Sequence, residues 1–422
     1  MNRIILTMFL LIFINIIYAL PDGDSKFQIV ECVRKIEGNV DSSACLQSIL
    51  NMKGESGGTI NIPAGVYTVN KTLVVPSNIT INAAGVTIKP NFSTPNSPVF
   101  ILHGVKNVTI KDVKILGDGK FSTQMVQNKY DDKSKSIGFS NRDYGIIING
   151  NSNNITIKNS KLSGIEYGII VEGNIKNRKP IIDNVFILNN SFTNIGMAGI
   201  RIVNAKNIQI KNNIIYDISG NFSSGLKPIV SDSRFGDGIY LAGAKNSTIS
   251  NNIIYNVIRI GIVLEVSLDE NKILFPNDGI TISNNYIRKV QNSRGTEGNG
   301  GIWIEGGNAN AKGDIVNISL GVKINDNIID NQGALPGAHM QFGILDGAKS
   351  AIIRNNKIFN FNNFNNYGIY CKQRSLLESN VVYGNYNGVF VNSGKNNISY
   401  KNNIILNNNI LDNKRDVIIN EK

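Results

Sequence analysis

The chain has 422 residues and a net charge of +12, and 41% of its residues are hydrophobic. A chain of this length exceeds what one conventional hydrophobic core usually organises, unless the fold grows by stacking repeated units. The positive charge fits either a solvated outer face or attraction to a polyanion, such as a polyuronate or a cell surface. No recognisable motif accompanies the charge, which argues against a nucleic-acid partner.

Residues 1–19 have the pattern of a secretory signal peptide. A basic start at Asn2-Arg3 precedes an apolar run from Ile4 to Ile17, and a small residue follows at Ala19. The run is too short for a good membrane span, and an uncleaved anchor is the alternative. We therefore expect a secreted, extracellular protein (periplasmic or at the cell surface in a bacterium) with no membrane span after signal removal.

The three cysteines are unevenly placed. Cys32 and Cys45 lie close together ahead of the repeats described below, and export would allow them to form a disulfide. Cys371 lies inside an apolar strand and is expected to be a buried thiol. No cluster of cysteine and histidine residues suggests zinc.

Residues 57–81 carry short β-branched runs separated by glycine, proline and asparagine. They read Gly57-Gly58-Thr59-Ile60-Asn61-Ile62-Pro63-Ala64-Gly65-Val66-Tyr67, then Leu73-Val74-Val75 and Asn78-Ile79-Thr80-Ile81. This opening resembles that of the pectate-lyase-like superfamily, whose members are right-handed parallel β-helices. The resemblance implies an all-β fold with a single solenoid over residues 57–422. It also implies that residues 20–56 cap the open end through an amphipathic helical segment around Leu46, Ile49 and Leu50.

The resemblance covers nearly the whole chain after the signal, but it is more specific for fold than for activity. The superfamily includes lyases, hydrolases, epimerases, phage spikes and adhesins. The Asn-Thr-Asp-Gly and Asp-Asp motifs of polygalacturonase-type hydrolases do not occur together here, and the Asp-Pro-His-Asp signature of alginate epimerases is absent. Neither of those two activities is therefore implied.

A short pattern recurs from residue 110 onward: an apolar residue, a spacer, a pair that is usually Asn-Asn, one further residue and a second apolar residue. Its copies begin at residues 110, 157, 187, 210, 249, 282, 324, 353, 377 and 400. This spacing predicts about ten or more coils, each with two short strands, the first of which ends in the Asn pair. The second Asn of each pair is expected to accept a left-handed corner and to form a hydrogen-bonded ladder.

The second strand of each repeat begins with a glycine, from Gly145 to Gly388. With the glycine as position zero, strand alternation points positions two and four outward. Long insertions on both sides of this strand predict a cleft along the solenoid, centred between Arg201 and Lys372. The insertions are residues 116–143, 216–236, 288–299 and 330–341 before the strand, and 266–279 and 306–319 after it.

The outward positions differ from those of a merely solvated face. Position two includes Arg201, Tyr240, Trp303 and Tyr370, and position four includes Glu265, Glu305 and Lys372. The aromatic residues suit the C–H faces of sugar rings, although Tyr240 and Trp303 would equally cover apolar loop residues. Arg201 and Lys372 would bind a uronate carboxylate or pair with a Glu.

Glu265 and Glu305 should be neighbours, because adjacent coils stack about 4.8 Å apart. Two carboxylates that close would raise one pKa, unless a cation lies between them. Three interpretations follow: the acid and nucleophile pair of a retaining glycosidase, a Ca²⁺ site of oxygen ligands, or an ion-paired surface. No metal ligand set is assigned.

Asp237 stands in a row of aromatic residues, directly before Gly238. A carboxylate there could be a general acid or base with a raised pKa, or it could cap the preceding loop. His339 lies in a cleft-wall loop and could act as a base near neutral pH. Asp346 takes an inward position, where a structural role with hydrogen bonds is favoured.

These observations favour a secreted carbohydrate-active protein that acts on a polysaccharide. In a lyase, Arg201 or Lys372 would neutralise a uronate carboxylate, and His339 or Lys372 would remove the adjacent proton. In a hydrolase, two of Asp237, Glu265 and Glu305 would act as acid and base or nucleophile. The alternatives are a non-catalytic adhesin or carbohydrate-binding protein and a purely structural solenoid.

Overall fold

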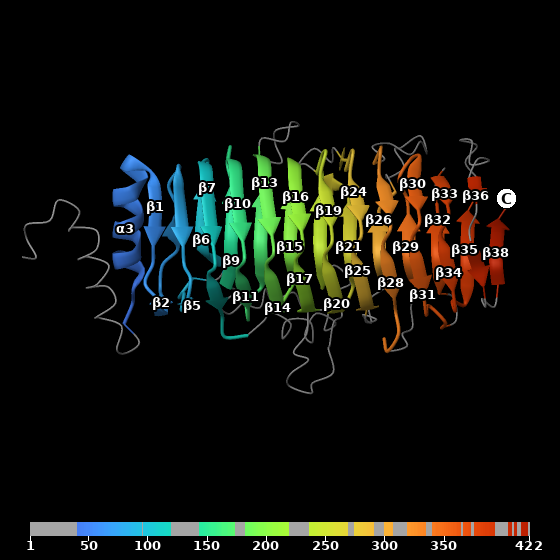
Figure 1. Cartoon of the computed structure of the whole chain (residues 1–422), viewed down its shortest axis with the longest axis horizontal. Helices are drawn as coiled ribbons and strands as arrows, with labels where there is room; N and C mark the ends of the chain where they lie inside the picture. The colour runs from blue at the N-terminus through green and yellow to red at the C-terminus, as the bar shows by residue number, and fades with distance from the viewer. Residues whose placement is uncertain are drawn as a thin grey trace, which may run out of the picture.

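The computed structural model describes fourteen stretches of the chain. They are residues 40–94, 96–119, 143–173, 182–218, 236–268, 274–290, 299–306, 319–334, 340–363, 366–372, 375–392, 404–406, 409–411 and 415–420. These residues form one helix and three long parallel sheets, whose strands stack side by side along a single axis (Figure 1). The predicted all-β parallel solenoid with a helical cap is confirmed.

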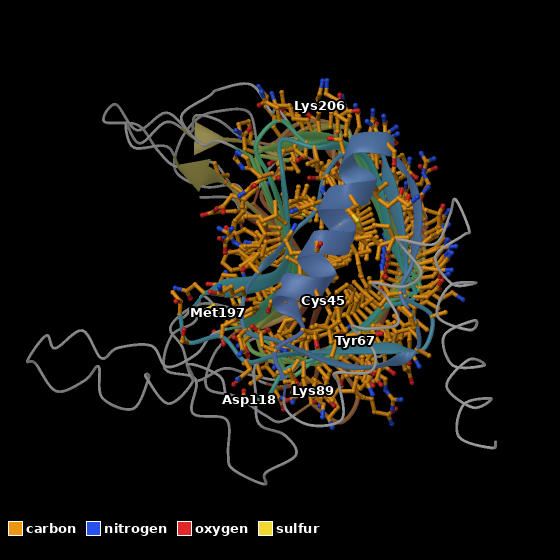
Figure 2. The ribbon with its side chains drawn as sticks, turned by 90° about the vertical axis from the view of Figure 1, so that its left-hand side faces the viewer. Cys45, Tyr67, Lys89, Asp118, Met197 and Lys206 are labelled. Atoms are coloured by element: carbon orange, nitrogen blue, oxygen red, sulfur yellow. The ribbon has the colours of Figure 1, made fainter. Side chains whose placement is uncertain are left out.

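Helix α3 (Ser43–Ser56) covers the open end of the coil, in front of the stacked strands in Figure 2. Leu46, Ile49 and Leu50 are buried on one of its sides, at the spacing of a helical face. The helix ends at Gly57, whose N–H donates to the Lys53 carbonyl at 2.7 Å. No helix in the described part of the chain is long and apolar enough to cross a membrane. The predicted signal segment lies outside that part.

The first sheet has twelve strands, each paired in parallel with its neighbour one coil away. They are β1 (Gly58–Asn61), β4 (Ile79–Asn82), β7 (Lys106–Lys111), β10 (Asn153–Lys158), β13 (Ile182–Leu188), β16 (Ala205–Lys211), β19 (Thr248–Ser250), β24 (Thr281–Ser283), β27 (Lys323–Asn325), β30 (Ala351–Arg354), β33 (Ser375–Glu378) and β36 (Ile404–Leu406).

The second sheet also has twelve strands and follows the first around a corner. They are β2 (Gly65–Val69), β5 (Val86–Pro90), β8 (Lys114–Leu116), β11 (Lys161–Ser163), β14 (Ser191–Ile195), β17 (Ile214–Ile218), β20 (Ile253–Val257), β25 (Tyr286–Val290), β28 (Ile328–Asp330), β31 (Lys357–Phe359), β34 (Val381–Tyr383) and β37 (Asn409–Leu411).

The third sheet contains the glycine-led strands. They are β3 (Leu73–Val74), β6 (Ser97–His103), β9 (Asp143–Asn149), β12 (Tyr167–Glu172), β15 (Ala198–Val203), β18 (Asp237–Ala242), β21 (Ile260–Glu265), β26 (Asn299–Ile304), β29 (Gln341–Asp346), β32 (Tyr367–Cys371), β35 (Asn387–Asn392) and β38 (Arg415–Asn420). A small antiparallel pair, β22 (Ser267–Leu268) and β23 (Leu274–Phe275), follows β21.

Each coil therefore has three strands, and the prediction of two was wrong. The residues after the Asn pair, such as Ile253 to Val257, form a strand of their own in the second sheet. The reason is the corner itself. Asn251, the first residue of its pair, has φ 55°, a left-handed backbone that turns the chain out of the first sheet.

The predicted asparagine ladder is confirmed, but it uses a different residue from the one that turns the chain. From Asn190 to Asn356 the second Asn of the pair is buried and donates its amide to the side-chain oxygen of the next coil. For Asn252 to Asn285 this distance is 2.9 Å. The same amide also donates to the Ile210 carbonyl at 3.0 Å. The ladder runs through Asn190, Asn213, Asn252, Asn285, Asn327, Asn356 and Asn380.

The core consists of rows of aliphatic side chains that run along the axis and fill the interior in Figure 2. One row of fully buried isoleucines crosses the first sheet in register, for example Ile210, Ile249 and Ile282. Burial of each such side chain contributes about 1.5 to 3 kcal/mol, so stacking identical coils accumulates stability without a single large core.

The glycines of the third sheet admit no side chain. A Cβ on Gly238 would lie 2.5 Å from the Gly261 carbonyl oxygen and 2.7 Å from Cγ2 of Ile254 in the core. Strand pairing passes over these glycines, as when Tyr167 pairs with Ala198 and Ile169 with Ile200. This local break in the alternation puts the residue before the glycine on the outer face. The ring of Phe342, which precedes Gly343, accordingly lies 6.2 Å from that of the outward residue Trp303.

Candidate functional site

The outward row at position two assembles as the sequence predicts. Successive coils pair Arg201 with Tyr240, Tyr240 with Val263, and Val263 with Trp303. The row then continues through Leu345, Tyr370 and Phe390. Tyr240 and Trp303 therefore lie on the same face of the third sheet, separated only by Val263.

The row at position four runs beside it and contains the acidic residues. Glu172 pairs with Val203, and Ala242 pairs with Glu265. The Glu305 N–H donates to the Leu264 carbonyl at 2.8 Å, which places Glu305 one coil beyond Glu265. Its Oε2 accepts the Val266 N–H at 2.8 Å. Glu305 is therefore held toward the coil of Glu265 by a backbone hydrogen bond.

A residue that the sequence reasoning missed, Arg259, connects the candidate acids. Its Nη1 donates to Asp237 Oδ2 at 2.8 Å, and its Nη2 donates to Glu265 Oε1. Arg259 is fully buried, and the Glu265 side chain keeps 24% of its surface exposed. The guanidinium also lies 5.3 Å from the centroid of the Trp303 ring. Arg259 thus pairs Glu265 with Asp237, whereas the three interpretations of Glu265 with Glu305 stay predictions.

Asp237 is the most strongly perturbed acid of this network. Burial raises the pKa of its carboxyl to about 7, the charge of Arg259 opposes that shift, and the charge of Glu265 adds to it. Only 2% of the residue is exposed. Asp237 therefore changes charge near neutral pH, inside a network that it shares with Arg259 and Glu265.

Tyr240 closes the network on the side opposite Trp303. Burial, the charge of Glu265 and a hydrogen bond to Glu265 all raise the pKa of its phenol, so this residue stays protonated. Arg201 lies 5.5 Å from the centroid of the Tyr240 ring and pairs with Glu172 at 3.3 Å. Both predicted aromatic residues thus present one ring face to an arginine.

Two buried polar atoms of the site lack a partner among the described residues. Asp237 Oδ1 and Trp303 Nε1 are both enclosed, and neither makes a hydrogen bond there. Such atoms are costly unless a water, a ligand or another group satisfies them. Oδ1 is an acceptor when Asp237 is ionised and Nε1 is a donor, so the two atoms need partners of opposite kinds.

Lys372 and Tyr370 lie at the far end of the row. Tyr370 stacks on Phe390 at 4.7 Å and meets Tyr367 edge-on at 5.1 Å. Desolvation lowers the pKa of Lys372, and the charge of Glu305 opposes that shift. Five coil steps separate Arg201 from the coil of Lys372, or roughly 24 Å at the usual strand spacing. These two cations cannot act on the same sugar residue.

Two of the predicted site residues, His339 and Cys32, lie outside the described residues. Cys45 is disulfide-bonded and Cys371 is a free, buried thiol. Because Cys32 is not among the described residues, its pairing with Cys45 stays a prediction. The loops proposed as cleft walls also fall largely outside the described stretches. Where the chain is described, no group of three or more His, Cys, Asp or Glu side chains is arranged to hold a metal ion.

Asp346 lies in the core, as the sequence reasoning favoured. It accepts hydrogen bonds from the Ser375 hydroxyl and from the Ala348 N–H, the latter at 2.9 Å. Burial raises the pKa of this carboxyl to about 7. It faces the interior, away from the outward rows, and its role is structural.

A sequence signal for Arg259 existed but was not used. The residue two places before the strand glycine is polar in most coils. Asp143, Glu166, Arg259, Asn299, Gln341 and Asn366 all occupy this place, and all are buried. A buried charge at a repeated position needs a partner, so this row predicts ion pairing beside the outward rows.

The family described as "Right handed beta helix region" matches residues 144–324. These residues include β9 to β27, the middle of the three sheets. The chain is a right-handed parallel β-helix protein. No curated protein matches this β-helix protein in sequence.

Solved structures resemble the β-helix protein at low sequence identity. PfbA, a surface adhesin of Streptococcus pneumoniae, has a TM-score of 0.61 and 16% identity over 87% of this chain and 86% of its own. The mannuronan C-5 epimerase AlgE4 A-module of Azotobacter vinelandii has a TM-score of 0.61 and 14% identity over 91% and 94%. A GH87 alpha-1,3-glucanase from Streptomyces thermodiastaticus has a TM-score of 0.58 and 12% identity over 88% and 66%. At these identities the likeness concerns the fold alone.

Proposed function

We propose that this β-helix protein is an extracellular carbohydrate-active protein that binds a polysaccharide on the outer face of its third sheet and hydrolyses it. The observation that carries the proposal is the linked group of Asp237, Arg259 and Glu265 between Tyr240 and Trp303. It combines a carboxyl that titrates near neutrality with unsatisfied buried polar atoms. Perturbed carboxyls with unsatisfied neighbours are typical of functional sites.

The chemistry divides between two kinds of carboxyl. Asp237, with a pKa of about 7, remains largely protonated at mildly acidic pH and can give its proton to a glycosidic oxygen. Glu265 shares the Arg259 guanidinium with Asp237 and can act as base or nucleophile, with Glu305, which is held by the Val266 N–H, as the alternative for this role. A raised-pKa acid beside a second carboxyl is the arrangement that glycoside hydrolysis uses.

A lyase is less well supported by the same geometry. Elimination needs a cation on the uronate carboxylate and a base beside the adjacent proton. Roughly 24 Å separates Arg201 from the coil of Lys372, so these two cations cannot share the tasks on one sugar residue. A lyase built on Lys372 would instead need His339, which lies outside the described residues.

The test is a reducing-end assay against a panel of neutral and anionic polysaccharides, with ultraviolet detection of unsaturated products. Hydrolysis predicts new reducing ends without ultraviolet absorbance, and Asp237→Asn or Glu265→Gln should lower the rate by about 100-fold or more. Asp183→Asn, in strand β13 of the first sheet, is the matched control and should leave the rate unchanged. Unsaturated products would establish a lyase instead, and no product across the panel from folded protein would contradict both.

A non-catalytic carbohydrate-binding role is the second candidate, and one observation favours it. Arg259 already neutralises the acids in the absence of any ligand, and Asp237 and Arg259 are nearly fully enclosed. Binding without cleavage predicts that glycan affinity survives the combined substitutions Asp237→Asn, Glu265→Gln and Glu305→Gln. Affinity electrophoresis of that triple variant, beside the activity panel, separates the two roles.

A further inference from the structure

Lysine side chains gather at the corner between the first and second sheets, in two adjacent coils. On the first sheet Lys111 pairs in register with Lys158. On the second sheet Lys114 pairs in register with Lys161. Lys114 and Lys161 are exposed, and Lys111 and Lys158 are half-buried. Adjacent strands lie about 4.8 Å apart, so the corner holds two lysine pairs at close range.

The lysines of this corner lack the ion pairs that charged side chains form in other coils of the described solenoid. Arg354 has Glu378 as its neighbour in the next coil, at 2.6 Å, and Lys206 pairs with Asp183 at 3.1 Å. The four corner lysines, by contrast, form no ion pair with any residue that the structure describes. Asp112, in the turn of the same corner, lies between Lys111 and Lys114, and no acidic residue lies between Lys158 and Lys161. The corner therefore keeps a clear excess of positive charge.

Like charges directly opposite each other on neighbouring strands destabilise a sheet. The arrangement is thus unfavourable for the isolated protein, and an anionic partner would relieve it. Such a cluster also attracts anions over about 8 to 10 Å at physiological ionic strength. The same interpretation gives these lysines a role within the net positive charge, for which the sequence left a solvated face and a polyanion site open.

The neighbouring side chains indicate which polyanion fits. Thr109 and Thr156 point outward beside Lys111 and Lys158, and Asn82 precedes Lys111 in the same row. Hydroxyls and amides next to ammonium groups suit a polymer that carries both hydroxyls and carboxylates. The exposed large apolar side chains of the described residues all lie in other coils, which argues against a membrane surface. The nearest are Val66 and Val74 on one side and Ile214 on the other.

We propose that the lysine corner, defined by Lys111, Lys114, Lys158 and Lys161, binds a linear anionic polysaccharide that lies along the solenoid axis. It belongs to the first and second sheets, so it is separate from the rows of the third sheet. Met197, which precedes the third-sheet strand β15, and Lys206, the second residue of the first-sheet strand β16, lie on different sides of the coil in Figure 2. The corner would hold a charged polymer while the third sheet acts on it or on another glycan.

The test measures binding and does not depend on cleavage. The probe is polygalacturonate, titrated into the full chain at low and high salt. The variant Lys114→Gln, Lys158→Gln and Lys161→Gln should weaken binding by about tenfold or more at low salt and flatten the salt dependence. The matched control, Lys323→Gln, Lys349→Gln and Lys357→Gln, removes the same charge from exposed positions in later coils and should bind within about twofold of the wild type.

Three outcomes would overturn the proposal. Equal losses in the two lysine variants would mean that net charge alone attracts the polymer. Loss of binding in Arg201→Gln/Lys372→Gln, with none in the corner variant, would assign binding to the third sheet. Equally tight binding of the wild type to vesicles of anionic phospholipid, or to single-stranded DNA, would remove the assignment to polysaccharide.

Discussion

Arg259 donates to Asp237 at 2.8 Å from the neighbouring coil, and the side chains of both are enclosed, at 1% and 3% exposure. The pair links the row of buried polar residues, which lie two places before the strand glycines, with the outward carboxyls. Glu265, on the same strand as Arg259, shares the guanidinium. One arginine thus fixes two candidate catalytic carboxyls from consecutive coils.

Replacement of Arg259 by Met should destabilise the protein by about 3 to 5 kcal/mol, because it leaves an enclosed carboxylate without its partner. The loss should be smaller at pH 5 than at pH 8, since Asp237 can become neutral by binding a proton at the lower pH. Urea unfolding of the wild type and the variant at both pH values measures this loss of stability.

The double variant Asp237→Asn/Arg259→Met is the control for that prediction. It removes the stranded charge, so it should recover part of the loss that Arg259→Met shows at pH 8. Equal free energies of unfolding for Arg259→Met and the double variant at pH 8 would show that Asp237 is not a stranded charge.

The buried carboxyl of Asp346 should make stability depend on pH. Its folded pKa of about 7 lies above its ordinary value of 3.8, so the folded state binds the proton more tightly. The contribution is fully present below about pH 4 and is lost as the pH rises through about 7, by roughly 2 to 4 kcal/mol. Asp237 and Asp143 are shifted in the same direction and add to the trend.

Asp346→Asn isolates this contribution. An amide at this position can accept the Ala348 N–H and donate to the Ser375 hydroxyl, and it carries no charge at any pH. Thermal unfolding at pH 5 and pH 8 should therefore differ less for the variant than for the wild type. An unchanged difference would exclude Asp346 as a source of the pH dependence.

The two asparagines of each corner should respond differently to substitution. Asn252→Ala removes an acceptor for the Asn213 N–H and a donor to Asn285, and should cost about 2 to 4 kcal/mol. Asn251→Gly keeps the left-handed turn at φ 55° and should cost less than about 1 kcal/mol. Chemical unfolding of both variants checks the order, and a greater loss for Asn251→Gly would contradict it.

The fold could be predicted because it rests on repetition. The Asn pairs and strand glycines recur at regular places, and stacking identical residues gives the ladder from Asn190 to Asn380 and the register from Arg201 to Phe390. The residues after the Asn pair, such as Ile253 to Val257, were missed as a third strand because they are short and follow the corner at once. The left-handed corner was assigned to the second Asn of the pair, but it lies at the first, such as Asn251.

The site could be predicted only in part, because its key contact crosses coils. Pairing in register brings Tyr240 and Trp303 onto one face, as alternation requires. Arg259 lies near the start of its strand, and its long side chain reaches Asp237 on one coil and Glu265 farther along its own. Neither the reach of a side chain nor the break at the glycine follows from counting alternate residues.

Activity should also follow the protonation of Asp237. If it is the general acid, kcat should fall as the pH rises through about 7, where its carboxyl loses the proton. Arg259→Lys keeps the charge but loses the two-sided hydrogen bonding, and should shift this limb of the profile. An unchanged pH profile in Arg259→Lys would show that the titration of Asp237 does not cause the fall in kcat.

The central claim is that a glycan occupies the third sheet above Asp237, Arg259 and Glu265. The most direct measurement is a crystal structure of Asp237→Asn with an oligosaccharide from a polymer that the protein binds or cleaves. The account predicts a sugar oxygen within hydrogen-bond distance of Trp303 Nε1 and of the side chain at position 237, between Tyr240 and Glu305. A sugar bound only to the first or second sheet, with those atoms satisfied by protein groups, would contradict it.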